Sequence, residues 1–430
     1  MNHIPKIRLK QFGLSIKCNR KRKHQLTHRH QWTQSEFCKD ICAQNSLISV
    51  EKGNISRFLE NYSLFAERLG LKITYSPDID KRLEVYTKEI YHAIEYYDFA
   101  VMVKYFEKLY ELLDPVKDYL WYCDLYYAAS VIEGYYMERK FINSDDRLYY
   151  ADMIGEFSDE WDEMLKAIIF ISEYHDLDSI EYLNYFKSFG IDKCKSSFNK
   201  VNTMLFLYDQ DRTRKLLDLA RQYEQEWIEQ KNDLRLLDLY SIILPCFSFH
   251  DVYEVEDVYN TIMDILETHD VPKYKKAECY YGIGFAYYNL EMYDETIENL
   301  MQAYKYDEAN VIPIYVYIAH AQRMLGRKIE LPNYSKKDIS KHAIIYQKFY
   351  KYYEIIENTP ELAEKYIMTH IIPVLSTCTD RCIFEIMQKE VELLANQTNR
   401  YKLIVRYRDK VKIPEELNKK KLYFRRTAKR

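Results

Sequence analysis

Histidine and cysteine side chains gather near the start of the chain, where their types would suit a zinc ion. They are His24, His28, His30, Cys38 and Cys42. Cys38 and Cys42 fall on the apolar side of an expected helix, so we interpret them as core thiols. The histidines then belong to a basic arm, and we expect no metal site.

Other patterns that carry chemistry are missing from the sequence or have simpler explanations. No glycine-rich phosphate loop occurs, and neither does a GxSxG, HExxH or CxxC string. Cys378 and Cys382 are four residues apart, which suits packing or a helix surface. Adjacent acidic residues such as Asp159 and Glu160 are typical of solvated helix faces. We therefore expect no enzyme activity and no cofactor.

The composition favours an all-α fold. Only 9 glycines and 10 prolines occur in 430 residues, whereas β-sandwiches and glycine-rich nucleotide-binding folds need glycine for tight reversals. Apolar residues make up 47% and charged residues 30% of the chain, which is enough for a large core. The length predicts two or more domains.

The sequence also predicts a cytoplasmic protein that does not enter a membrane. Its basic N-terminal stretch lacks the apolar run of a secretory signal. No apolar stretch of about 18 residues occurs that could span a bilayer. The nine scattered cysteines favour reduced thiols over a disulfide framework.

Charge is distributed unevenly along the chain. Residues 1–75 hold 14 basic and 5 acidic residues, a net charge of +9, and residues 400–430 hold 13 and 3, a net of +10. The middle therefore carries a net charge of −23. A basic segment on an acidic body is typical of a nucleic-acid-binding module joined to another domain. A solubilising arm without a partner is the alternative interpretation.

The basic N-terminal region contains the pattern of three short helices. Thr33 can cap the first, and Glu36 can return the bond in a capping box. A second short helix ends at Gly53, and a third is expected from about Ser56 to Gly70. The apolar face of the third comprises Phe58, Leu59, Tyr62, Phe65, Ala66 and Leu69. Two short helices across a tight turn favour a helix-turn-helix.

This region resembles the Cro/CI-like (XRE) helix-turn-helix family. The residues that carry the resemblance are Thr33-Gln34, Phe37-Cys38, Val50-Glu51, Gly53 and Leu69-Gly70-Leu71. The resemblance implies double-stranded DNA as a partner, with Gln44, Asn45, Ser46 and Ser49 facing the major groove. Glutamine and asparagine can pair with adenine edges. Phosphate contacts are expected from Gln34, Lys52, Asn54 and Arg57. Polar residues on any exposed short helix would look the same.

The longer remainder predicts stacked helical hairpins. Residues 277–310 form a unit of 34 residues, the tetratricopeptide period, with small and aromatic residues at that repeat's packing positions. It resembles a tetratricopeptide repeat, and a weaker echo follows around Ile318 and Gly326. Such hairpins stack into a superhelix with a concave groove. We expect a helix-turn-helix domain at 1–75, an α-solenoid at 76–399 and a basic tail at 400–430.

On the tetratricopeptide pattern, one groove wall carries side chains suited to an extended peptide. They are Tyr281, Phe285, Tyr288, Asn289, His320 and Arg323. The whole architecture resembles the RNPP class of peptide-sensing regulators, which implies a homodimeric transcription regulator that responds to a short signalling peptide in quorum sensing. Packing between helices is the alternative role of these residues. The alternative function is a repeat scaffold that binds a protein partner, with the basic head as an anchor or dimerisation device.

Overall fold

The chain folds entirely into helices and connecting turns in the part that the structure describes. This computed structural model describes residues 4–176, 181–210, 212–247, 252–306, 311–330, 332–340, 342–375 and 381–411. Within these ranges there is no β-strand, only an isolated bridge between Lys72 and Tyr119. The expected all-α class is confirmed. Cys378 and the part of the basic tail after residue 411 lie outside the described residues.

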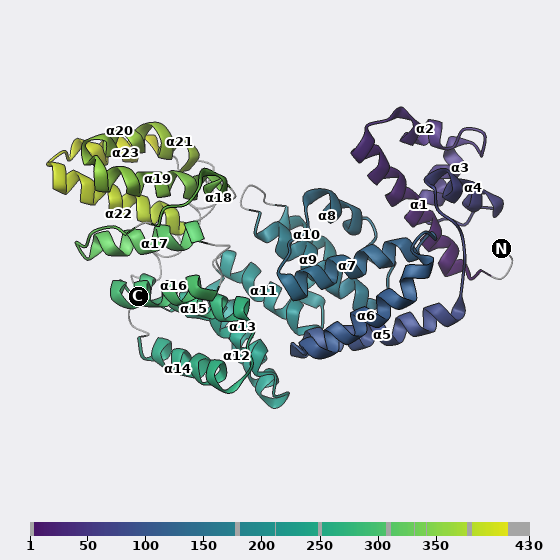
Figure 1. Ribbon diagram of the computed structural model, residues 1–430, viewed down its shortest axis with the longest axis horizontal. Helices are drawn as coiled ribbons and strands as arrows, with labels where there is room; N and C mark the ends of the chain where they lie inside the picture. Colours follow the sequence, from purple (N-terminus) through teal and green to yellow (C-terminus); the bar gives the residue numbers. More distant parts are fainter. Residues whose placement is uncertain are drawn as a thin grey trace. The chain divides into compact units, whose positions relative to one another are not determined.

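The chain divides into two compact units, residues 1–203 and 204–430. Helices of the first unit are α1 (Lys6–Thr27), α2 (Gln34–Phe37), α3 (Gln44–Glu51), α4 (Glu60–Leu69), α5 (Pro77–Tyr96), α6 (Phe99–Leu113), α7 (Tyr122–Glu138), α8 (Ser144–Ala151), α9 (Asp159–Tyr174), α10 (Tyr182–Phe189) and α11 (Ser197–Asp209), which continues past the boundary (Figure 1). Residue 75, where we expected a domain boundary, lies inside this unit. We call residues 1–75 the head and residues 76–203 the platform.

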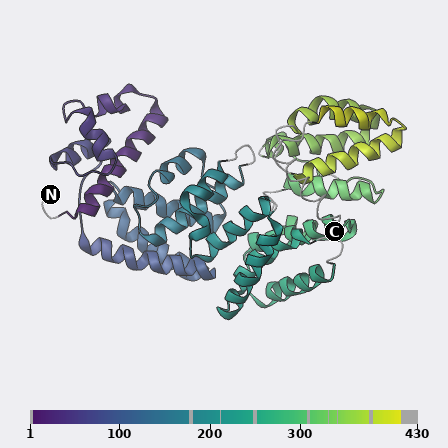
Figure 2. The same cartoon turned by 180° about the vertical axis from the view of Figure 1, so that it is seen from behind.

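Helices of the second unit are α12 (Thr213–Glu229), α13 (Asp233–Ile243), α14 (Val252–Thr268), α15 (Lys273–Asn289), α16 (Tyr293–Tyr306), α17 (Val311–Met324), α18 (Lys336–Ile339), α19 (Ile344–Asn358), α20 (Ala363–Tyr366), α21 (Ile372–Leu375), α22 (Arg381–Thr398) and α23 (Lys402–Lys410). Successive helices pair as hairpins, which can be followed from both sides (Figures 1 and 2). Figure 2 shows the hairpins from behind.

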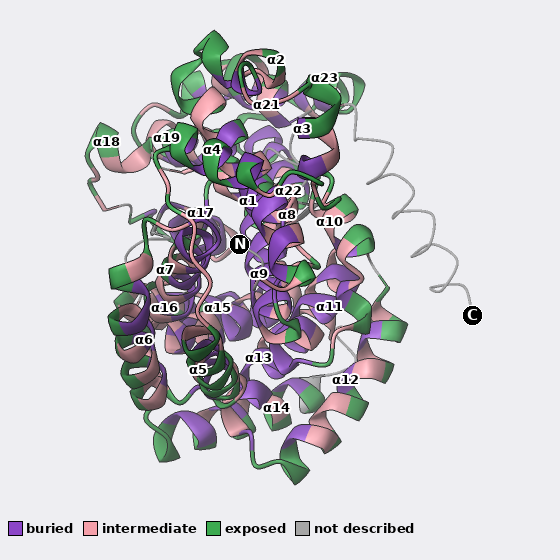
Figure 3. Ribbon diagram, turned by 90° about the vertical axis from the view of Figure 1, so that its right-hand side faces the viewer, coloured by how far each residue is buried: buried purple, intermediate pink, exposed green. Residues whose placement is uncertain are grey.

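Helix starts in the platform follow the local sequence. Ser76 accepts a hydrogen bond from the backbone N–H of Ile79, and Pro77 supplies a fixed φ at the first position of α5. Asp98 caps α6 in the same way through the N–H of Val101. Helix α9 is buried around most of its surface, whereas α5 keeps an exposed face (Figure 3). The platform is therefore built around α9.

The head has two glycine-terminated helices, as the sequence predicts. Gly53 after α3 and Gly70 after α4 both have a left-handed φ, of 82° and 74°. In the first, Asn54 donates to the carbonyl of Ser49 and Gly53 donates to that of Val50, which is a Schellman cap. The start of α4 differs from the prediction, because this helix begins at Glu60 and leaves Phe58 63% exposed.

The predicted repeat unit at 277–310 is the hairpin of α15 and α16, of which residues 307–310 lie outside the described residues. Gly284 on α15 faces Leu300 on α16 so closely that an added Cβ would lie 2.7 Å from the leucine Cδ2. Glycine therefore suits this packing position, because any side chain would force the Leu300 side chain to shift.

Candidate functional site

Helix α1 packs directly against α3 within the head. Gly13 on α1 faces the carbonyl of Val50 near the end of α3, and an added Cβ would lie 2.2 Å from that oxygen. Phe12, Ile16 and Leu47 are fully buried in the same core. The close approach of the two backbones fixes where α3 lies on α1.

A buried ionic network ties α1, α2 and α3 together. Arg20 donates from Nε and Nη2 to the two carboxylate oxygens of Glu51, at 2.6 and 3.0 Å. Its Nη1 donates to the carbonyl of Trp32 at 2.8 Å. The amide of Gln34, at the start of α2, donates to the same Glu51 at 2.6 Å. A two-point arginine–carboxylate pair is geometrically specific, so it holds both short helices in one arrangement.

The turn between α2 and α3 is held from the other side by α4. Arg68 Nη1 donates to the carbonyls of Phe37 and Lys39, at 2.8 and 2.7 Å. These carbonyls close the end of α2, where no helical N–H is available to them. The capping box expected at the start of α2 is not formed: the Thr33 oxygen accepts no bond from the backbone of α2, and its hydroxyl donates to the carbonyl of His30.

The predicted base-reading residues lie where α3 begins. Gln44, Asn45 and Ser46 are exposed in the first turn of α3, and Ser49 is half-buried one turn later. Ala43 precedes α3 and supplies no side-chain cap. These four polar side chains therefore lie on α3, three of them exposed in its first turn. Gln34 differs, because its amide is bonded to Glu51 and not free for a phosphate.

Much of the positive charge of the head is neutralised within its own unit. Five cations of α1 pair with platform carboxylates: Arg8 with Asp80, Lys10 with Glu156, Lys17 and Lys21 with Asp152, and Arg22 with Asp146. The net charge of +9 therefore overstates what is available to a nucleic acid.

The cations that are left identify the candidate phosphate contacts. Lys52 and Arg57 are exposed, as is Asn54, and neither cation makes an ion pair among the described residues. Arg29, in the turn before α2, is a third exposed cation of this kind that the sequence analysis missed. The sequence alone does not distinguish Arg29 from the five cations of α1 named above. The structure does, because those five pair with platform carboxylates.

The predicted peptide wall lies in the second unit, and several of its side chains bind the protein itself. His320 Nδ1 donates to Glu390 at 2.6 Å, and Arg323 Nε donates to Glu390 at 2.7 Å. Tyr352 and Tyr353 add hydroxyl bonds to the same carboxylate, at 2.9 and 3.3 Å. We call these five residues the Glu390 cluster. His320 and Glu390 are completely buried.

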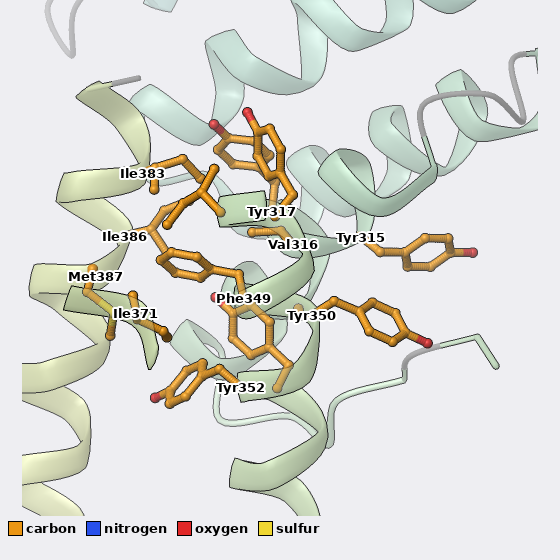
Figure 4. Packing of buried hydrophobic residues seen from close by; sticks show 14 of the residues in the cluster. Tyr315, Val316, Tyr317, Phe349, Tyr350, Tyr352, Ile371, Ile383, Ile386 and Met387 are labelled. Atoms are coloured by element: carbon orange, nitrogen blue, oxygen red, sulfur yellow. The ribbon is translucent and has the colours of Figure 1, made fainter. Parts of the chain in front are cut away.

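Helix α22, which carries Glu390, covers this wall as part of the core. Ile383, Ile386 and Met387 of α22 lie against Phe349 of α19 (Figure 4). Burial acts to raise the pKa of Glu390, but the hydrogen bonds and charges of the cluster hold it below its ordinary value. His320 and Arg323 therefore take part in packing between helices, which was the alternative role of these residues.

The other members of the wall are placed in the same region without forming an open surface. Tyr288 is buried, and its ring lies 5.9 Å from that of His320. The amide of Asn289 donates to the carbonyl of Pro245 at 3.1 Å, so this donor already bonds within the protein. Tyr281 and Phe285 are half-buried, with ring centroids 4.7 Å apart in a tilted arrangement.

Comparisons with family models, curated proteins and solved structures find no match to this chain. Among the described residues, no helix is long and apolar enough to cross a membrane. In the same ranges no group of three or more histidine, cysteine and acidic residues could hold a metal ion.

Proposed function

We propose that α2 and α3 form a helix-turn-helix that binds duplex DNA, and that the chain is a transcription regulator. The observation that carries the proposal is the Arg20–Glu51–Gln34 network, which fixes α2 and α3 while Gln44, Asn45 and Ser46 remain exposed. A rigid support with a polar exposed helix start is what major-groove reading requires.

The charges of the head fit this function. Arg29, Lys52 and Arg57 are exposed cations, and Lys39 is 64% exposed beside Glu36. Each cation that neutralises a phosphate adds about one to the slope of log affinity against log salt. The proposal therefore predicts that the affinity for DNA falls strongly as salt rises, although few cations contact the phosphates.

We further propose that the DNA-bound form is a homodimer. A single helix-turn-helix reads few base pairs, and two-fold dimers that bind two half-sites are the common solution. Light scattering of the full chain with and without DNA tests this part separately. A mass of one 52.2 kDa chain under both conditions would contradict it.

Selection from a random duplex library by the full chain tests the DNA-binding function. The parent is expected to enrich a defined sequence, and Gln44→Ala or Asn45→Ala should lose preference at one base position, about 1–3 kcal/mol. Gln222→Ala, an exposed glutamine on α12, is the control and should select as the parent does. No enrichment by the parent at low salt would overturn the proposal.

For regulation we propose a short peptide effector. The Glu390 cluster limits how this peptide can bind. A peptide carboxylate that uses Arg323 and His320 must displace Glu390, and with it the apolar contacts of α22. Half-buried Tyr281 and Phe285 supply aromatic contact area without that displacement. A peptide effector is therefore expected to contact these two side chains first, and Phe285→Ala should weaken its binding in calorimetry more than Arg323→Lys.

A further inference from the structure

Helix α1 is shared between the head and the platform, and it contacts them through different residues. At 100° per residue, Gly13, Ile16 and Arg20 lie on one side of the helix. Gly13 and Arg20 contact α3 through Val50 and Glu51. Ser15 and Asn19 lie on a second face, about 110° further round the helix, and face α7.

The contact on the platform side is a completely buried carboxylate, Asp124 in the first turn of α7. The hydroxyls of Ser15 and Tyr149 both donate to it, and Asn19 Nδ2 donates at 3.0 Å. Ser15 Oγ in turn accepts the N–H of Trp121 at 3.3 Å. Two of the three donors to Asp124 therefore belong to the head.

Asp124 is the most deeply buried acidic partner of α1 in the platform, since Asp80, which pairs with the buried Arg8, is 27% exposed. The ion pairs of Lys10, Lys17 and Lys21 with the platform have partly exposed partners, and such pairs contribute little. A buried carboxylate that loses its donors keeps the whole desolvation penalty. Burial raises the pKa of Asp124 in the folded chain, while the bonds from Ser15, Tyr149 and Asn19 act to lower it. The hydrogen bonds from Ser15 and Asn19 are therefore needed to keep the Asp124 carboxylate buried.

We propose that Asp124 is a positioning residue for DNA binding, which fixes the orientation of the head on the platform through Ser15 and Asn19. This inference rests on the proposed DNA-binding function and on its dimeric form. With each head held rigidly on its platform, the distance between two recognition helices is set by the body of the protein. The expected consequence is a strict spacing between half-sites.

The first arm of the test needs no DNA. Lys72 lies in the connection from the head to α5, and its backbone bonds to Asp118 and Leu120 at 2.9 and 2.8 Å. Limited trypsin digestion of the full chain measures cleavage at this position. Asp124→Asn should speed it by about tenfold at a temperature where circular dichroism shows an unchanged helical content.

Asn199→Ala is the control for general loss of stability. Asn199 is fully buried in the same unit and bonds to Glu163 and Ser196, not to α1. This variant should leave cleavage at Lys72 within twofold of the parent after correction for its unfolding temperature. Equal rates in the parent and Asp124→Asn would overturn the inference, whatever the protein does with DNA.

The second arm measures affinity for paired half-sites whose separation varies by single base pairs. The parent should bind one spacing at least tenfold better than its neighbours, and Asp124→Asn should flatten this profile while binding a single half-site within threefold of the parent. A parent that binds DNA without a spacing preference would overturn the inference and leave the proposed function standing. A parent that binds no DNA fails the proposed function instead.

Discussion

Arg20 and Glu51, 31 residues apart in sequence, form a two-point ion pair in the core of the head, with side chains 8% and 4% exposed. Removing one partner of a buried pair leaves the other charge uncompensated. Arg20→Ala is therefore expected to destabilise the first unit by about 3–5 kcal/mol. Thermal or denaturant unfolding of the full chain measures this effect.

Lys21→Ala is the matched control for that prediction. Lys21 is the next residue of α1, and its pair with Asp152 is half-exposed. Its removal should change stability by about 0–1 kcal/mol. Equal losses in the two variants would show that burial of the Arg20 pair does not decide its contribution.

Gly13→Ala is expected to disturb the head by steric conflict alone. The new Cβ would lie 2.2 Å from the carbonyl oxygen of Val50, so α3 must move away from α1. Overpacking of this kind costs about 1–3 kcal/mol, and DNA binding should weaken together with stability.

Gly134→Ala provides the opposite result in the same unit. The nearest atoms to its added Cβ belong to the Lys140 side chain at 3.8 Å, an ordinary contact. Alanine is favoured over glycine inside a helix by about 0.5–1 kcal/mol, so this variant should be neutral or stabilised. Destabilisation by both substitutions would count against the close contact of α1 and α3.

The stability of the first unit should depend on pH through Asp162. Burial raises the pKa of this carboxyl to about 7, although the N–H of Gly155 donates to it at 2.8 Å. Its Oδ1 is buried without a hydrogen-bond partner. Because the folded pKa lies above the unfolded value, the folded state holds the extra proton between about pH 4 and 7. The contribution of Asp162 to stability therefore decreases as pH rises from about 4 to 7 and is lost above the folded pKa.

Asp162→Asn tests this dependence by removing the titration. The free energy of unfolding of the variant minus that of the parent should be larger at pH 8 than at pH 5, by on the order of 2 kcal/mol. Unfolding curves at both pH values give the difference directly. A parent and variant with parallel pH profiles would show that Asp162 does not carry the effect.

Arg323→Ala should destabilise the second unit, because it leaves the buried Glu390 carboxylate without its paired arginine. The expected loss is about 3–5 kcal/mol. Arg327→Ala is the control: this arginine, just after α17, is 53% exposed and pairs with Asp294 at 2.6 Å. Its loss should be within about 1 kcal/mol. If Arg323→Ala leaves stability unchanged, the cluster is not holding α22 and the wall is accessible to a peptide.

Local sequence patterns predict the parts of this fold that depend on near neighbours. The buried face of α3, its end at Gly53 and the hairpin of α15 and α16 follow from apolar spacing and glycine position. Phe58 was expected in a helix because its spacing fits, yet the chain turns there, and the backbone N–H of Phe58 bonds to the Ser56 hydroxyl.

The remaining features depend on residues far apart in sequence. Helix α1 is buried on two faces and carries Arg8 and Arg20 inside, so its apolar period is blurred. The bond from Ser15 to Asp124 joins positions 109 residues apart, and Arg323 meets Glu390 across 67. Spacing could place Arg323 on a helix face, but it could not show that α22 covers that face.

Because α1 contacts both α3 and the platform, the head cannot be exchanged freely for the head of another protein. A recombination or engineering junction placed after the head would transfer Ser15 and Asn19 away from Asp124 and leave that acid buried with Tyr149 alone. A transplanted head must therefore bring serine-like and asparagine-like donors at the same helical positions, or the platform must lose its acid. Under the proposed function, a new DNA specificity is more easily obtained by changing the exposed start of α3 than by replacing the whole head.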